Sequence, residues 1–161
     1  MNLSIEPIAA PTTEAMALLE ELDSLLGAMY EPEQRHSLSV EQLFAPNIRF
    51  FVARLHGQPA GCGGIAFSDG YAEVKRMYSR PPLRGRGIAK ALLARLEQEA
   101  RQAGHAVLRL ETGIRQPEAI GLYERCGFRR CAPFGPYAAM NSAQIGTSLF
   151  YEKRLPEGLA L

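Results

Sequence analysis

Near the middle of the chain, the residue pattern changes from that of a β-strand to that of a helix, with a glycine-rich turn between the two. Asp69-Gly70 is a turn signal that leads into a predicted strand at Tyr71–Tyr78. Arg80-Pro81-Pro82 ends this strand, because proline has no amide hydrogen to donate to a sheet. From Gly87 to Gly104 the spacing is helical, with one apolar stripe made by Ile88, Leu92, Leu96 and Ala100. The chain therefore has to fold as a strand, a tight turn and an amphipathic helix in succession.

The turn itself, Leu83–Lys90, combines glycine with positive charge. Glycine lets the backbone turn tightly and approach a ligand closely, and the free amides and dipole of a helix N-terminus favour phosphate oxygens. Arg84, Arg86 and Lys90 add charge at the same end. The GK[ST] ending of a Walker loop and the GxGxxG pattern are both absent. The turn by itself indicates a phosphate-binding site.

Bulk properties exclude several classes of protein. A length of 161 residues predicts one domain spanning 1–161, with a loose tail at 155–161. With 47% hydrophobic and 22% charged residues, the composition is that of a globular protein. A net charge of +1 gives no general field for nucleic acid or an anionic membrane. We therefore expect no nucleic-acid partner and no membrane partner.

The cysteines and histidines give no sign of a metal or disulfide framework. Cys62, Cys126 and Cys131 are odd in number and lack CxxC spacing, and the three histidines are scattered. The first ten residues lack the basic start and long apolar core of a signal peptide, and no apolar run reaches membrane-spanning length. We expect a metal-free protein located in the cytoplasm.

The remaining segments predict a sheet covered by helices. The predicted strands, besides Tyr71–Tyr78, are Leu3–Pro7, Ile48–Leu55, Pro59–Ser68, Val107–Glu111, Phe128–Cys131 and Ser148–Arg154. The predicted helices, besides that from Gly87, run from Thr12 or Thr13 to Gly27, from Ser39 to Leu43 and from Pro117 to Gly127. The segment 132–147 is predicted to be a loop.

Two linked motifs resemble those of the GCN5-related N-acetyltransferase (GNAT) family. Arg84–Ala89 fits the family's Arg/Gln-x-x-Gly-x-Gly/Ala signature, and Leu122–Phe128 is similar to its Leu-Tyr-x-x-x-Gly-Phe. The resemblance covers roughly Tyr71–Arg130, in the family's order. It implies an α/β (α+β) fold with a mixed, mostly antiparallel sheet of about six to seven strands and helices on both faces. It also implies a V-shaped splay between two central strands, Tyr71–Tyr78 and Val107–Glu111.

The resemblance implies acetyl-CoA as co-substrate, without a metal. Met77 and Tyr78 would pair with the pantetheine arm, the turn would hold the pyrophosphate, and Gln116 would contact the cofactor. The turn residues carried over in this way are Arg84, Gly85, Arg86, Gly87, Ile88, Ala89 and Lys90.

Two residues are candidates for acid–base catalysis. Glu73, eleven residues before Arg84, matches the position of the catalytic glutamate in the histone-acetylating branch and would deprotonate the amine. The alternative is that Glu73 only forms an ion pair with Lys75 or Arg76. Tyr123 would protonate the departing thiolate, since a phenol of pKa about 10 can donate to a thiolate of pKa about 8.5; the alternative is that it only packs near the cofactor.

The acceptor side is less constrained. Lys75 and Arg76 would hold a substrate carboxylate, unless they are merely solvated or paired. The other predicted acceptor contacts are Tyr30, Glu111 and Tyr137. We expect His36 to be solvated and Cys126 to be a packing residue.

These features predict direct transfer of an acetyl group, through a tetrahedral intermediate, to a small-molecule amine such as an amino acid. A protein or peptide amine, a non-catalytic acyl-CoA-binding module and a nucleotide- or phosphate-binding enzyme remain as alternatives. In the family, dimers through the C-terminal strand are common, so a homodimer is one option.

Overall fold

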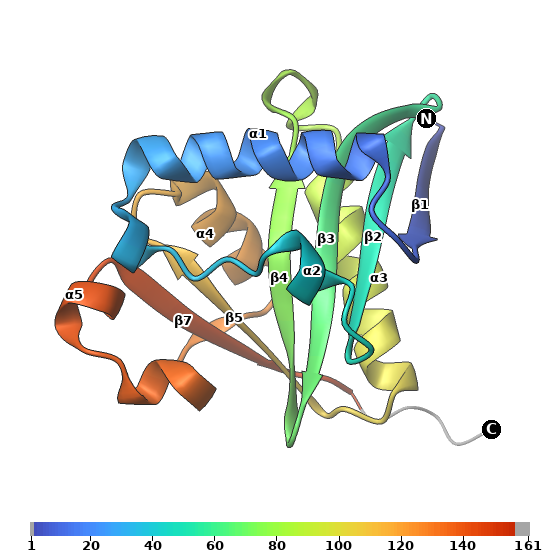
Figure 1. Ribbon diagram of the computed structural model, residues 1–161. Helices are drawn as coiled ribbons and strands as arrows, with labels where there is room; N and C mark the ends of the chain where they lie inside the picture. The colour runs from blue at the N-terminus through green and yellow to red at the C-terminus, as the bar shows by residue number, and fades with distance from the viewer. Residues whose placement is uncertain (1, 157–161) are drawn as a thin grey trace.

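The computed structural model describes residues 2–156, which form one seven-stranded sheet with helices on both faces (Figure 1). The strands are β1 (Leu3–Ile8), β2 (Ile48–Leu55), β3 (Gln58–Ser68), β4 (Tyr71–Ser79), β5 (Val107–Gly113), β6 (Arg129–Arg130) and β7 (Ser148–Arg154). The α-helices are α1 (Thr13–Met29), α2 (Val40–Leu43), α3 (Ile88–Gln102), α4 (Pro117–Arg125) and α5 (Ser142–Ile145). Short 3-10 helices are η1 (Pro32–Gln34), η2 (Pro81–Leu83) and η3 (Gly135–Ala139). None of the helices in residues 2–156 has both the length and the hydropathy needed to cross a bilayer.

The sheet is mixed and mostly antiparallel, which confirms the predicted fold class. Its strand order is β1-β2-β3-β4-β5-β7-β6. The first four strands pair antiparallel, β4 and β5 are parallel, and β7 pairs antiparallel with both β5 and β6. Helix α3 makes the crossover that a parallel β4–β5 pair requires. The predicted glycine turn therefore lies at the end of a central strand.

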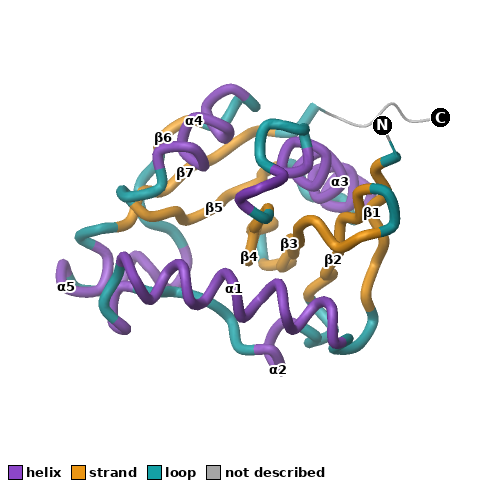
Figure 2. The backbone as a smooth tube through the Cα atoms, turned by 90° about the horizontal axis from the view of Figure 1, so that it is seen from above, coloured by secondary structure: helices purple, strands orange, loops and turns teal. Residues whose placement is uncertain are grey.

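Helices cover the two faces of the sheet unequally. Seen along the strands, α1 and α2 lie on one side and α3 and α4 on the other (Figure 2). The larger apolar cluster joins α3 and α4 to the sheet and includes Leu92, Leu96 and Tyr123. A smaller cluster lies under α1 and includes Leu18 and Leu22. The sheet is thus buried on both faces, and its central strands are accessible where they separate.

Strands β4 and β5 separate after a short stretch of pairing. Only Ala72, Glu73 and Val74 of β4 are in register with β5. Each strand then continues without the other, β4 to Ser79 and β5 to Gly113. This splay opens the centre of the sheet at the carboxyl ends of both strands.

A bulge in β4 lies beside the splay. Cys62 pairs with Tyr78 and Gly64 with Lys75, so the single residue Gly63 stands opposite both Arg76 and Met77. Arg76 adopts the left-handed region at φ 57°. A bulge redirects the side chains that follow it, and here both Lys75 and Arg76 contact groups on the α1 side of the sheet. Alternation alone would have placed them on opposite faces.

Three segments differ from the sequence predictions. The predicted loop at 132–147 contains η3 and α5, because Asn141 and Gln144 form a reciprocal capping box. Strand β6 is only Arg129–Arg130, shorter than predicted. Leu155, placed in the predicted loose tail, is buried and its amide donates to the Ala106 carbonyl at 2.8 Å; residues 157–161 of that tail lie outside the described residues.

Candidate active site

A groove of about 880 Å³ runs past the end of β4, the start of α3 and the start of α4. Met77, Tyr78 and Gln116 line it, as do the residues of the glycine turn with one exception. The turn residues in the wall are Arg84, Gly85, Gly87, Ile88, Ala89 and Lys90. Arg86 is exposed and does not line the groove. The fold thus gathers nearly all of the predicted cofactor-binding residues along one groove.

The glycine turn presents free backbone amides to this groove. Gly85 and Gly87 have φ values of 84° and 79°, a region that favours glycine. Gly87 is the N-cap of α3, and no side chain in residues 2–156 caps it. The first helical bond runs from Ala91 N to Gly87 O at 3.0 Å, so the amides of Ile88 and Ala89 precede the hydrogen-bonded ladder. A methyl group added at either glycine would meet nothing within 4 Å. The turn can therefore bring its amides close to a pyrophosphate.

Two basic residues of the groove were missed in the sequence analysis. Arg115 precedes α4 and Arg125 ends it, and both line the groove opposite the turn. Arg125 lies inside the Leu122–Phe128 motif, three residues after Leu122, which also lines the groove, so the i,i+3 spacing of a helix face could have found it. Arg84 is held by the carboxylate of Glu118 at 3.3 Å. Both walls of the groove thus carry cationic groups suited to phosphate.

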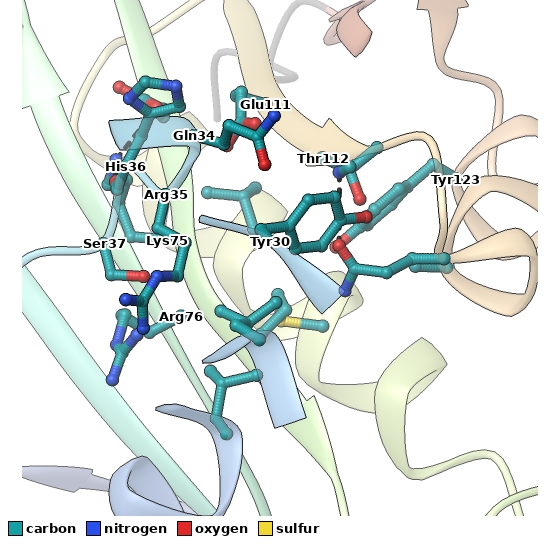
Figure 3. A pocket seen from close by; sticks show the side chains of 18 residues that line it. Tyr30, Gln34, Arg35, His36, Ser37, Lys75, Arg76, Glu111, Thr112 and Tyr123 are labelled. Atoms are coloured by element: carbon teal, nitrogen blue, oxygen red, sulfur yellow. Dashed lines mark hydrogen bonds and ion pairs between the residues drawn. The ribbon is translucent and has the colours of Figure 1, made fainter. Parts of the chain in front are cut away.

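A second, smaller cavity of about 110 Å³ opens on the α1 side of the splay (Figure 3). Its polar lining includes Tyr30, Gln34, Arg35, His36, Ser37, Glu73, Lys75, Arg76, Glu111 and Thr112. Five residues line both this cavity and the groove: Leu22, Met77, Gln116, Ala119 and Tyr123. The two spaces therefore share one wall, which lies where β4 and β5 part.

Glu73 belongs to a closed hydrogen-bonded triangle. Tyr137 donates its hydroxyl to Glu73 Oε2 at 2.7 Å, and Lys75 Nζ lies 3.2 Å from the same oxygen and 3.0 Å from the Tyr137 hydroxyl. Lys75 also donates to the His36 carbonyl at 3.3 Å. Burial, followed by the charge of Glu73, raises the pKa of Tyr137, which keeps this phenol a donor. The ion pair considered as the alternative for Glu73 is thus present, and Glu73 also lines the cavity.

Glu111 is the second carboxylate of the cavity. Ser148 donates its hydroxyl to Glu111 Oε2 at 2.7 Å. Burial raises the pKa of Glu111, and the neighbouring charge of Glu73 acts in the same direction. A raised pKa brings a carboxyl closer to the pH at which it can exchange a proton with an amine.

Tyr123 stands in the wall that the two spaces share. It comes from α4, is 6% exposed, and packs edge-on against Phe128. Burial, followed by the charge of Glu111, raises the pKa of Tyr123, so its hydroxyl stays protonated at neutral pH. Cys126 is partly buried and packs against the main apolar cluster. Tyr123 therefore presents a protonated hydroxyl where the two spaces meet.

Tyr30 closes the cavity from the end of α1. Its hydroxyl accepts a hydrogen bond from the Arg115 amide at 2.9 Å, and burial raises the pKa of Tyr30. The ring lies over Gly113, where a β-carbon would overlap the hydroxyl. Only glycine at the end of β5 allows this approach.

His36 is not simply solvated as expected. Its Nε2 lies 2.8 Å from the Gln144 carbonyl, and its ring packs edge-on against Tyr137 at 5.4 Å. The carbonyl comes from α5, in the segment predicted to be a loop. Residues 2–156 contain no group of three or more His, Cys, Asp or Glu side chains arranged to hold a metal ion.

Comparison with known proteins gives consistent relatives. The family model described as "Acetyltransferase (GNAT) family" matches residues 16–128. An IAA acetyltransferase of Azospirillum brasilense is 46% identical over 149 residues, 91% of this chain and 94% of its own length. An aminoalkylphosphonate N-acetyltransferase of Salmonella typhimurium is 31% identical over 94 residues, 55% of this chain and 61% of its own. A crystal structure from Klebsiella pneumoniae, described as a candidate acyl-CoA N-acyltransferase, has a TM-score of 0.78 and 35% identity, covering 96% of this chain and 98% of its own.

Proposed function

We propose that this chain, which belongs to the GNAT acetyltransferase family and is an N-acetyltransferase, uses acetyl-CoA to acetylate the amine of a small molecule. The observation that carries the proposal is the shared wall. A long groove with a phosphate-binding turn meets a small polar cavity at Met77 and Tyr123. A donor and an acceptor bound in these two spaces would come together at the splay of the sheet.

The groove fits acetyl-CoA. Its open glycine turn and flanking cations suit a pyrophosphate, and the part of β4 beyond its pairing with β5 leaves backbone groups for an extended arm. When bound, acetyl-CoA supplies an acetyl thioester, whose carbonyl is open to attack by an amine.

Glu73 and Tyr123 are proposed as base and acid. An amine acceptor is mostly protonated at pH 7 and has to lose a proton before it attacks. Glu73, which is hydrogen-bonded by Lys75 and Tyr137, would accept this proton directly or through water. Glu111 would hold the amine from the β5 side. Tyr123, protonated and in the shared wall, would give its proton to the departing sulfur.

A small acceptor is favoured by the size of the cavity. About 110 Å³ is several times the ~10–15 Å³ that one water needs, which suits a compact metabolite. The names of two relatives, an IAA acetyltransferase and an aminoalkylphosphonate N-acetyltransferase, also point to small acceptors. A protein or peptide amine is the alternative acceptor, and a non-catalytic acyl-CoA-binding module is the alternative function. The cytoplasmic location and the homodimer stay predictions.

Thermal stabilisation by acetyl-CoA tests the groove. At 100 times Kd, binding should stabilise the wild type by about 2.7 kcal/mol. Gly87→Glu should abolish this gain, because its carboxylate would repel the pyrophosphate. Gly57→Glu is the matched control: Gly57 also has a φ near 80° and open space around it, but it lies in the β2–β3 turn. If acetyl-CoA does not raise the melting temperature of the wild type, the groove assignment is refuted.

Release of free thiol from acetyl-CoA with a panel of amines then tests turnover. Glu73→Gln and Tyr123→Phe should each lower kcat/KM by about 10²–10⁴-fold. Tyr151→Phe is the control, since Tyr151 is buried and bonded to Glu124 away from both spaces. Stabilisation by acetyl-CoA without thiol release for any amine would favour the non-catalytic module.

A further inference from the structure

Two arginines in the wall of the acceptor cavity have buried nitrogens without hydrogen-bond partners. In the part of the chain that the structure describes, Nε of Arg35 and both Nε and Nη1 of Arg76 are buried and unpaired. The Arg76 side chain is 4% exposed. Buried polar groups are nearly always satisfied, and an unsatisfied charged donor is costly. Three such atoms around one cavity indicate a group that the cavity is built to receive.

The two guanidinium groups lie along the same side of α1. Arg76 Nη2 donates to Asp23 at 2.7 Å and to the Leu19 carbonyl at 3.4 Å. Arg35 Nη1 lies 3.3 Å from the position that a β-carbon on Gly27 would take. Gly27 follows Asp23 by four residues, about one helical turn. Both side chains line the cavity and are labelled in Figure 3.

Charge is distributed unevenly across this cavity. At the α1 end, Asp23 is the ion-pair partner of Arg76 and is itself mostly exposed, while Arg35 forms no ion pair within residues 2–156. At the β5 end stand the carboxylates of Glu73 and Glu111. Lys75 stands beside Glu73 as its ion-pair partner, and its three donors already have three acceptors. The cavity thus has guanidinium groups with unpaired nitrogens at one end, and the carboxyl groups of Glu111 and of the Lys75-paired Glu73 at the other.

We propose that Arg35 and Arg76 together bind a carboxylate of the acceptor, so that the substrate class is a small amine that also carries a carboxylate. The planar guanidinium fork matches a carboxylate in shape and supplies charge-assisted bonds. The amine of the same molecule would lie toward Glu73 and Glu111. This assignment rests on the proposed function, and it replaces Lys75 by Arg35 in the carboxylate pair expected from the sequence.

The test compares L-amino acids with their own carboxamides as acceptors. For each pair, the ratio of kcat/KM for the acid to that for the amide is measured in the wild type and in variants. Arg35→Gln should lower this ratio about 10- to 100-fold, mainly through KM of the acid. Arg35→Lys should restore part of it, because the charge returns without the fork. Arg49→Gln should keep the wild-type ratio, because Arg49 is an exposed residue of β2 that pairs with Glu99 of α3.

Arg76→Lys is the second variant, with its fold checked by circular dichroism because Arg76 is buried. An acid-to-amide ratio that stays at the wild-type value in both Arg35→Gln and folded Arg76→Lys would overturn the assignment while leaving the acetyltransferase proposal intact.

A binding measurement separates failure of this inference from failure of the proposed function. The melting temperature is recorded with each L-amino acid and its carboxamide in the presence of CoA, and no turnover is needed. Stabilisation by the acids that is lost in Arg35→Gln supports the carboxylate site even if no amine is acetylated. Equal effects of acids and amides in the wild type would refute it, whether or not acetyl transfer occurs.

Discussion

Replacing Gly113 with alanine is expected to displace Tyr30 from the wall of the acceptor cavity. A β-carbon at Gly113 would overlap the hydroxyl oxygen and Cζ of Tyr30 and lie 2.9 Å from its Cε1, where ordinary contact begins near 3.4 Å. Because the overlap involves a ring held between α1 and β5, the ring has to move by about 1 Å or more. The movement also breaks the hydrogen bond from the Arg115 amide to the Tyr30 hydroxyl.

The magnitude follows from these two losses. Overpacking of a buried site costs about 1–3 kcal/mol, and the lost hydrogen bond adds about 1 kcal/mol, because the exposed Arg115 can turn to water. We expect Gly113→Ala to lower the free energy of unfolding by about 2–4 kcal/mol. This is a large share of the 5–15 kcal/mol typical of a domain.

A double-mutant cycle with Tyr30→Ala isolates the overlap. With the ring removed, both the overlap and the Tyr30 hydrogen bond are gone and alanine at position 113 should cost little. The two substitutions should therefore show a coupling close to the full cost of Gly113→Ala, about 2–4 kcal/mol, in urea unfolding. Additivity within about 0.5 kcal/mol would show that the overlap is not the cause, and the argument from the close approach would be wrong.

Three further predictions concern ionisation and charge. Because burial raises the pKa of Glu111 above its usual 4.5, the free energy of unfolding of the wild type should fall as the pH rises from 4.5 through the raised pKa. Glu111→Gln should lack this fall, so in denaturation curves its stability relative to the wild type should increase by about 1.4 kcal/mol per pH unit within that range. Below pH 4 the relative stability of the two proteins should not change with pH. Burial raises the pKa of Cys62 to about 12, so mass spectrometry after iodoacetamide treatment at pH 8 should find it unlabelled while the other two cysteines, which are partly exposed, react. Asp23→Asn should destabilise the fold by about 1–3 kcal/mol in urea, because Arg76 loses its ion pair.

The parts of the site that were predictable from the sequence are local ones. The glycine turn could be predicted because its chemistry resides in consecutive residues, Leu83–Lys90, and a helix N-terminus has the same free amides in any fold. The strands and long helices were also predictable from periodicity, since each buries one face of its own sequence. The mixed sheet and the splay between its central strands came from the family resemblance and not from periodicity.

The contacts that organise the acceptor cavity were not predictable in this way. Tyr137 and Glu73 are separated by 64 residues, and their bond depends on η3, in a segment whose capping box was overlooked. The bulge at Arg76 turns that side chain to the opposite face of the sheet from the one that strand alternation predicts. Arg35 lies in a polar loop, and only its place against α1 shows that its Nε is buried and unpaired.

The wall shared by the groove and the cavity has a thermodynamic consequence. Five residues line both spaces: Leu22, Met77, Gln116, Ala119 and Tyr123. A ligand that orders these side chains from one space would therefore reduce the conformational entropy that a ligand in the other space has to lose on binding. Linkage makes this effect mutual: whatever factor the first ligand applies to the affinity of the second, the second applies to the first. A sheet that opens at its centre would thus couple binding in the groove to binding in the cavity, as well as bring the two ligands together.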